Sequence, residues 1–192
     1  MARQERKLVL VRHSLPEYVV GLPASEWQLS DEGRRRCGRL ADRLAAYDLA
    51  AVVTSTEPKA VETGQIVADS LSLPLETALG LHEHERGVVT STGDQGAFQE
   101  QVRRLFEHPD ELIFGTETAN HAHARFATTV AAVIEQHPHG NLAIVTHGTV
   151  MTLFIARSAG LDPVPFWKSL GLPAFAVLSL PGLHLMEVID NV

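Results

Sequence analysis

Four consecutive apolar residues, 8–11, two of them β-branched, run directly into Arg12 and His13, and Pro16 follows shortly afterwards. A short apolar run that ends near a breaker residue predicts a buried strand. The carboxyl end of this strand would carry a guanidinium and an imidazole to the edge of a sheet, where ligands bind in open α/β sheets. From this segment alone, an ordinary strand that ends in polar residues explains the pattern equally well.

The alternation of apolar and polar segments continues along the chain. Apolar runs predict further strands at 49–53 and 141–145. Apolar residues spaced three and four apart predict helices at 30–45, 58–68, 98–106, 119–134 and 148–160. The chain closes with a predicted hairpin at 175–189. Strands separated by helices are typical of a mostly parallel sheet with both faces covered. We therefore expect an α/β fold, a three-layer α/β/α sandwich with one antiparallel edge strand.

The length of 192 residues fits one domain, so we expect a single domain over 1–192. Its least regular part is 87–115, where glycine and proline interrupt the apolar pattern. We expect this segment to be a lid-like insertion that covers the substrate together with the loop at 15–28.

The charge balance narrows the range of partners. A formal net charge of −7 at pH 7 argues against a nucleic-acid binder, although it leaves room for a local cationic pocket. No run approaches the roughly 20 apolar residues of a membrane span, and too few apolar residues follow the basic start to form a signal peptide. Together with the lone Cys37, these features lead us to expect a cytoplasmic protein. The oligomeric state is left open.

Histidines and carboxylates follow three of the predicted extended segments. His13 follows the first strand, His147 follows the strand at 141–145, and Glu83 and Glu85 lie in a third such segment. Because parallel strands end at the same edge of a sheet, we expect these groups to converge. Histidine, arginine and carboxylate together supply a nucleophile or base, an anion clamp and a general acid.

Several motifs, in order along most of the chain, carry a family resemblance. Leu-Val-Arg-His-Ser at 10–14, followed by Leu-Ser-Asp-Glu-Gly at 29–33, resembles the histidine phosphatase superfamily, which includes phosphoglycerate mutases and many small phosphatases. The further matches to family motifs are the second phosphate-binding segment at 55–63, the acid motif at Glu83, the GES-like motif at 115–118 and the second histidine motif at 145–148.

The resemblance implies a role for each matching residue. His13 would be the nucleophile that forms a phosphohistidine, Arg12 would bind the phosphoryl oxygens, and His147 would stabilise the charge of the transferring group. Glu83 would protonate the leaving oxygen and then activate water. The attack needs a neutral imidazole nitrogen, and a guanidinium matches two phosphate oxygens at once. The substrate would be a small phosphorylated metabolite, and no metal or other cofactor would be needed, because cationic side chains neutralise the phosphoryl charge.

Three positions depart from the family pattern. Ser14 stands where glycine is usual, and its small size would still let the backbone approach phosphate. Lys59 stands where the second phosphate-binding arginine is expected; it keeps the charge but loses the planar two-point grip. Lys59 either binds phosphate as a point charge or is a solvent-facing helix residue. Glu83 and Glu85 compete for the acid role, and the spacing to Gly87 favours Glu83.

Two other kinds of site match parts of the sequence. Cys37 and Arg43 have the Cys-x5-Arg spacing of cysteine-dependent phosphatases, but Cys37 lies in the middle of a predicted helix, where its backbone donors are already used. Three close histidine pairs, at 82/84, 121/123 and 137/139, offer metal ligands, but no cysteine or aspartate completes a tetrahedral set. We therefore expect no metal site.

Two alternative functions would use the same residues. A non-catalytic phosphate-binding module would keep Arg12 and the histidines but would not need Glu83, so Glu83 favours an enzyme. Phosphoglycerate mutases of the family, which pass the phosphoryl group to a substrate hydroxyl, are generally longer, and this favours a phosphomonoester hydrolase. Arg86, Arg103 and Arg104 are candidates for binding a second anionic group of the substrate, although for each we favour an ordinary surface arginine.

Overall fold

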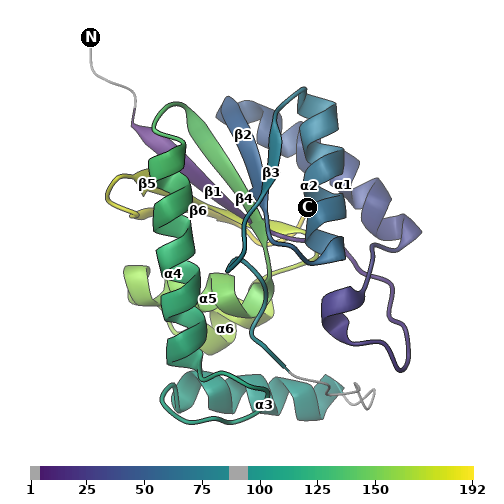
Figure 1. Cartoon of the computed structure of the whole chain (residues 1–192), viewed down its shortest axis with the longest axis vertical. Coiled ribbons are helices and arrows are strands. Elements are labelled where there is room, and N and C mark those ends of the chain that lie inside the picture. The colour runs from purple at the N-terminus through teal and green to yellow at the C-terminus, as the bar shows by residue number, and fades with distance from the viewer. Residues whose placement is uncertain (1–4, 87–94) are drawn as a thin grey trace.

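The computed structural model describes residues 5–86 and 95–192, and a six-stranded sheet with the order β3-β2-β4-β1-β5-β6 forms its centre (Figure 1). The strands are β1 (Arg6–Arg12), β2 (Leu49–Thr54), β3 (Leu75–Thr77), β4 (Asn141–Thr146), β5 (Ala174–Leu180) and β6 (Leu185–Ile189). The first four pair in parallel, whereas β5 pairs antiparallel with both β1 and β6. The antiparallel pairing therefore lies toward one edge of the sheet.

Helices cover both faces of this sheet. The α-helices of the described residues are α1 (Asp31–Leu44), α2 (Pro58–Leu71), α3 (Gln95–Glu107), α4 (Ala119–Gln136), α5 (Gly148–Ala159) and α6 (Pro163–Ser169), with short 3-10 helices at Ala24–Glu26 and Ala45–Tyr47. Figure 1 shows α1 and α2 together on one side of the sheet, α4, α5 and α6 on the other, and α3 across the end. The predicted three-layer α/β/α class is confirmed.

Alternate residues of each central strand point to opposite faces of the sheet, and helices bury both faces. In β1, Leu8 and Leu10 belong to the apolar cluster shared with α4 and α5, whereas Val9 and Val11 belong to the cluster shared with α1 and α2. All four residues are fully buried. The continuous apolar run of this strand follows from its position between two helical layers.

The start of α1 holds the loop that follows β1. Ser30 caps the helix, since its Oγ accepts a hydrogen bond from Gly33 N at 3.0 Å, and the same hydroxyl donates to Leu15 O at 3.1 Å. A Cβ at Gly33 would stand 2.1 Å from Leu15 O, so glycine is what lets the loop pass this close to the helix. This short motif thereby fixes the backbone next to His13.

The insertion predicted at 87–115 falls partly on residues 87–94, which lie outside the described residues. The rest forms α3 and the turns that lead to α4. α3 packs on α6 through Phe98 and Trp167, whose ring centroids are 6.0 Å apart. The sequence pattern does not predict α6, because its 7 residues are too few to display a helical apolar period.

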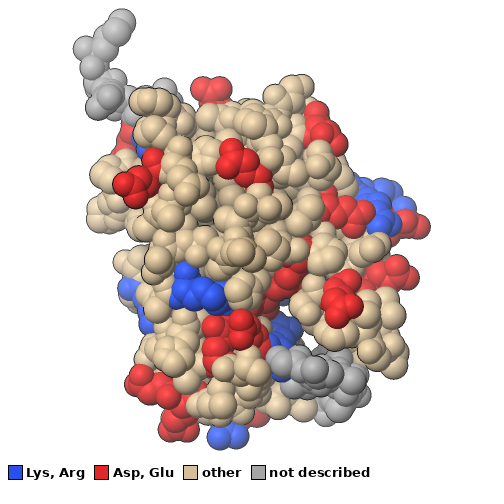
Figure 2. Space-filling model, in the orientation of Figure 1, with Lys and Arg blue, Asp and Glu red and all other residues tan. Residues whose placement is uncertain are grey.

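Figure 2 shows acidic side chains scattered over one face of the molecule, with smaller basic groups among them.

The 18-residue helix α4 keeps Ala122, Phe126 and Val130 buried and carries polar residues elsewhere. Among the helices of the described residues, none combines the length and the apolar character that crossing a bilayer requires.

Candidate active site

His13 and His147 lie side by side because β1 and β4 are neighbouring parallel strands. Arg12 is in register with Thr146, and the backbone N–H of His13 donates to Thr146 O at 2.9 Å. The next residue along each strand is a histidine, and the centroids of the two rings are 5.1 Å apart, with 59° between their planes. Both rings are buried. The convergence expected from the sequence thus places two imidazoles at one sheet edge.

The His13 ring is held in one tautomer. Its Nδ1 lies 2.7 Å from Ser14 O, and because a carbonyl oxygen only accepts, Nδ1 carries the hydrogen and Nε2 keeps its lone pair. Burial, and then the positive charges of Lys59 and Arg12, lower the pKa of His13 well below its ordinary value. His13 is therefore neutral at pH 7 and offers a nucleophilic nitrogen.

His147 is oriented by the segment that follows β2. Its Nε2 lies 2.6 Å from Ser55 Oγ, which already accepts from the Glu57 N–H at 3.2 Å. The Ser55 hydroxyl can donate its hydrogen to Nε2, and in that arrangement the ring hydrogen of His147 is on Nδ1. This Nδ1 is buried and has no hydrogen-bond partner among the described residues. Burial, followed by the charges of His13 and Lys59, lowers the pKa of His147 well below its ordinary value.

Arg12 is fixed from behind and leaves part of its guanidinium unused. Its Nη1 donates to Leu170 O at 2.5 Å, whereas its buried Nε has no hydrogen-bond partner within the described ranges. The guanidinium rests on the start of α5, where a Cβ at Gly148 would stand 3.0 Å from Nε. Burial lowers the pKa of Arg12 to about 10, so the side chain stays charged at neutral pH.

Glu83 reaches the same edge and binds the first turn of α5. Its carboxylate accepts from Thr149 N at 3.1 Å, Val150 N at 3.2 Å, His84 N at 2.9 Å and Arg86 Nη2 at 3.1 Å. Burial alone would raise the pKa of Glu83, but the charge of Arg86 and the backbone N–H groups outweigh it and lower the pKa to about 2. In this arrangement Glu83 is ionised.

Glu85, the alternative acid, lies outside this arrangement. Its side chain is 49% exposed and accepts a hydrogen bond from Thr116 Oγ1 at 2.8 Å. The structure therefore brings Glu83, and not Glu85, next to the start of α5.

Lys59 is a buried residue at the start of α2, with 5% of its surface exposed, so the alternative of a solvent-facing helix residue is wrong. Its ammonium contacts Glu57 Oε2 and donates to Ala24 O at 2.6 Å. The other carboxylate oxygen of Glu57 accepts from Glu83 N at 2.8 Å and lies 3.6 Å from His147 Nε2. Burial is the main cause that lowers the pKa of Lys59. The Glu57–Lys59 pair therefore belongs to the wall of the site.

Ser14 uses both of its donors within the protein. Its backbone N–H donates to Thr63 Oγ1 at 3.0 Å, and its hydroxyl donates to Gly33 O at 2.8 Å. Ser14 is fully buried between α1 and α2. The structure thus shows Ser14 holding the loop beside His13, with neither donor left for a phosphate.

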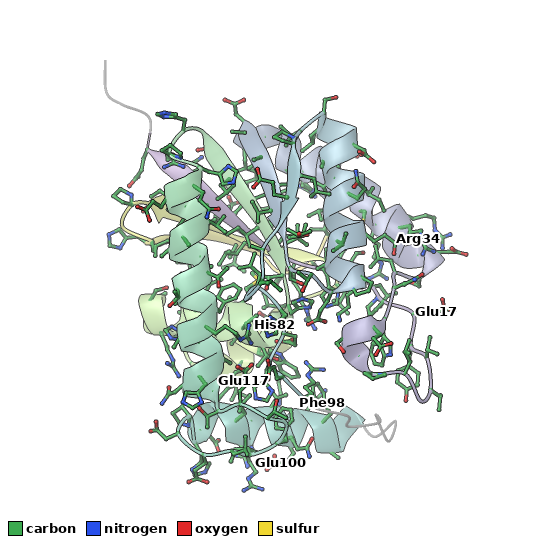
Figure 3. All side chains as sticks on the ribbon, in the orientation of Figure 1. Glu17, Arg34, His82, Phe98, Glu100 and Glu117 are labelled. Atoms are coloured by element: carbon green, nitrogen blue, oxygen red, sulfur yellow. The ribbon has the colours of Figure 1, made fainter. Side chains whose placement is uncertain are left out.

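Arg125 positions the loop that carries Glu83. This residue of α4 donates to Gly80 O at 2.7 Å, to His82 O at 3.0 Å and to Glu83 O at 3.2 Å. Glu117 pairs with the same guanidinium at 2.6 Å, and Figure 3 shows His82 and Glu117 close to α4. One arginine therefore binds three carbonyl groups of the segment 80–83, called the acid loop below.

Sequence reasoning did not single out Ser55, Glu57 or Arg125. Glu57 precedes Pro58, so the pattern reads as an ordinary helix start, and nothing local shows that its carboxylate turns toward the histidines. The only signal was that Ser55 and Glu57 fall within the segment 55–63, which resembles a phosphate-binding segment.

The other sequence motifs do not form sites. Cys37 is buried inside α1, and burial is the main cause that raises the pKa of its thiol, so it lacks the backbone cradle of a cysteine-dependent phosphatase. Of the paired histidines, His84 binds Glu117 O through Nε2 at 2.8 Å, and His123 stacks on Phe154. Residues 5–86 and 95–192 contain no group of three or more side chains placed to hold a metal ion.

A search against protein families matches residues 8–180 to the histidine phosphatase superfamily (branch 1), and the chain belongs to this superfamily. The resemblance carried by the sequence motifs is therefore confirmed. Among curated proteins, the chain is similar to the "Uncharacterized phosphatase PhoE" of Bacillus subtilis (strain 168), with 23% identity over 135 residues. This match covers 70% of the chain and 66% of the relative, just under two thirds of its length.

Two solved structures illustrate the shared fold. A mycobacterial glucosyl-3-phosphoglycerate phosphatase superposes with a TM-score of 0.75 at 19% identity, over 98% of this chain and 100% of that one. A phosphoserine phosphatase mutant from Entamoeba histolytica, in complex with phosphoserine, gives a TM-score of 0.76 at 16% identity, over 96% of this chain and 97% of that one. At these identities the comparison shows the fold alone.

Proposed function

We propose that this protein is a phosphomonoester hydrolase that acts through a phosphohistidine intermediate on a small phosphorylated metabolite. One observation carries the proposal: Arg12 and the His147 ring beside His13 each hold a buried nitrogen, Arg12 Nε and His147 Nδ1, that has no hydrogen-bond partner among the described residues. Buried donors in this state fit an anionic group, because a phosphoryl group supplies the missing acceptors.

In the first step the lone pair of His13 Nε2 forms a bond to phosphorus while the bond from phosphorus to the ester oxygen breaks. Arg12 and His147 stabilise the charge that spreads over the phosphoryl oxygens, and Lys59 adds a positive charge from the wall of the pocket. Glu83 gives a proton to the departing oxygen. A bound phosphoryl dianion next to Glu83 raises its pKa from the low value of the unliganded arrangement, so the carboxyl group can hold this proton.

In the second step a water oxygen forms a bond to phosphorus while the phosphorus–nitrogen bond breaks. Glu83, now a carboxylate, takes the proton of that water, and inorganic phosphate leaves with His13 neutral again. We favour water over a second substrate hydroxyl as acceptor because similar solved structures include phosphatases, a glucosyl-3-phosphoglycerate phosphatase and a phosphoserine phosphatase. The net charge of −7 supports a small metabolite, in preference to a nucleic acid, as the substrate.

The experiment measures phosphate release from p-nitrophenyl phosphate and from a panel of phosphorylated metabolites. We expect the wild type to hydrolyse at least one substrate, and His13→Ala to lower kcat by about 10³-fold or more because the nucleophile is missing. His139→Ala, which removes an exposed histidine far along the chain, is the matched control and should keep wild-type rates. Equal rates for the wild type and His13→Ala on every substrate would exclude the proposal.

A further inference from the structure

Arg86 follows the acid loop and points back at it. Its Nη2 lies 3.1 Å from Glu83 Oε2, and its guanidinium carbon lies 4.5 Å from the centroid of the Phe98 ring. Figure 3 shows Phe98 on the side of α3 that faces the body of the molecule, with Glu100 on the outer side. Arg86 is therefore held between a carboxylate of the site and an aromatic platform.

The guanidinium of Arg86 is neither exposed nor fully satisfied. Its side chain is 27% exposed, yet its Nε is buried and has no hydrogen-bond partner in the described part of the chain. Arg103 on α3 differs on both counts, since its side chain is 40% exposed and pairs with Glu100 and Glu107. Of these two arginines, only Arg86 has a buried donor available for a ligand.

The charge of Arg86 acts inside the phosphate pocket. In addition to the larger effect of burial, it lowers the pKa of Arg12, of Lys59 and of His147. Its Nη2 also donates to the same Glu83 oxygen, Oε2, that accepts from Thr149 N in the first turn of α5, so the guanidinium lies one side chain away from the proposed phosphate site.

Lys59 is a weaker phosphate ligand than the arginine it replaces. Position 59 carries lysine where the family pattern has its second arginine, and the Lys59 ammonium is already bound by Glu57 and by Ala24 O. A lysine so engaged supplies charge without the planar two-point grip that a guanidinium gives to phosphate.

We propose, on the basis of the phosphatase function proposed above, that Arg86 is the second phosphoryl-binding arginine of this protein. When substrate binds, the Arg86 guanidinium moves away from Glu83 and binds the phosphoryl oxygens of the substrate. The Phe98 ring keeps supporting the guanidinium. The exchange does two things at once: it binds the anion, and it frees the Glu83 oxygen that must carry the proton for the leaving group. Substrate binding and readiness of the acid are thereby linked through one side chain.

The test measures binding of inorganic phosphate and of vanadate by calorimetry, which needs no turnover. We expect Arg86→Gln to weaken phosphate binding by roughly 10- to 100-fold, the size expected for loss of a charge-assisted, two-point contact. Arg86→Lys should weaken binding by less, because it keeps the charge but loses the fork. Arg103→Gln removes one positive charge from α3 and should leave the Kd within about twofold of the wild-type value.

Arg86→Gln also removes the partner of Glu83, so an indirect effect has to be separated from direct contact. The same substitution is therefore made in a Glu83→Gln background, where the carboxylate that Arg86 pairs with no longer repels phosphate. Direct contact predicts a similar loss of affinity in both backgrounds. A loss that disappears in the Glu83→Gln background, or a phosphate Kd that Arg86→Gln leaves unchanged, would overturn the inference.

This design also separates the inference from the proposed function. If the wild type binds phosphate through Arg86 but hydrolyses none of the phosphate esters, the hydrolase proposal fails and the assignment of Arg86 stands. If the wild type hydrolyses esters and Arg86→Gln binds phosphate normally, the assignment fails alone. Should Arg86→Gln not fold, as judged by circular dichroism, the comparison of Arg86→Lys with the wild type decides, and a Kd within about twofold then counts against Arg86.

Discussion

Gly148 lies directly beneath the guanidinium of Arg12, and a Cβ at position 148 would stand 3.0 Å from Arg12 Nε and 3.1 Å from its Cζ. The glycine that follows His147 is therefore a spacing element for the residue that precedes His13. The two strand ends are matched not only by their histidines but also by this contact between a side chain and a helix start.

Gly148→Ala should displace the Arg12 guanidinium by a few tenths of an ångström, and we expect kcat/KM to fall by about 10-fold because a charge-stabilising group is misplaced. The flexible arginine can move, so the free energy of unfolding should change little. Gly38→Ala on α1 is the control, since a Cβ there meets nothing within 4 Å. Wild-type kcat/KM in Gly148→Ala would show that the Arg12 position is not critical.

Glu83→Gln should affect poor leaving groups most. Nitrophenolate departs without a proton, whereas an alkoxide needs one, so the loss of kcat/KM should be large for alkyl phosphates and small for p-nitrophenyl phosphate. The measurement is kcat/KM over a series of esters that differ in the pKa of the leaving alcohol. Glu85→Gln, at an exposed site, should retain the wild-type dependence; if it gained the steep one instead, Glu85 would be the acid.

Lys59→Met should destabilise the fold, because it leaves the Glu57 carboxylate buried without its cation. The side chains of Lys59 and Glu57 are 6% and 9% exposed, and breaking a buried pair from one side costs about 3–5 kcal/mol. Urea unfolding measures the loss. The double variant Glu57→Gln with Lys59→Met should recover part of it, and an equally unstable double variant would mean that Lys59 contributes by packing alone.

The low pKa of Glu83 also predicts an acid-sensitive fold. Between its ordinary value of 4.5 and the folded value of about 2, the unfolded chain binds a proton at Glu83 that the folded chain does not. Stability from Glu83 is therefore complete above pH 4.5 and is lost as the pH falls toward 2, with a total of roughly 3 kcal/mol from this group. Free energies of unfolding across this range should fall more steeply for the wild type than for Glu83→Gln. Parallel curves would contradict the low pKa.

The fold was predictable from the sequence where local pattern and tertiary environment agree. The apolar run before Arg12 and the one before His147 belong to strands buried on both faces, so each strand and its final polar residue could be located without coordinates. One short helix was not predicted: α6 has 7 residues, too few to show a period.

The candidate site was predictable where a residue follows a strand and less so where a side chain turns back. The backbone path alone places Arg12, His13 and His147 at the sheet edge. Glu57 and Arg86 reach the site only because their side chains bend toward it. This direction depends on side-chain rotamers, which contacts with Lys59, Glu83 and Phe98 set in the folded chain. The burial of Lys59 and the inward bonding of Ser14 were hidden for the same reason.

Arg125 holds the loop of Glu83 on a different element from the strands that carry His13 and His147. His13, the proposed nucleophile, and His147 follow the central strands β1 and β4, whereas the loop that carries Glu83, the proposed acid, is bound to Arg125 of α4 through three carbonyl groups. Changes around Arg125 can therefore shift the proton donor by small distances while the phosphorus-binding groups stay where they are. We therefore expect substitutions on α4 next to Arg125 to change which alcohols are released more than they change binding of the phosphoryl group.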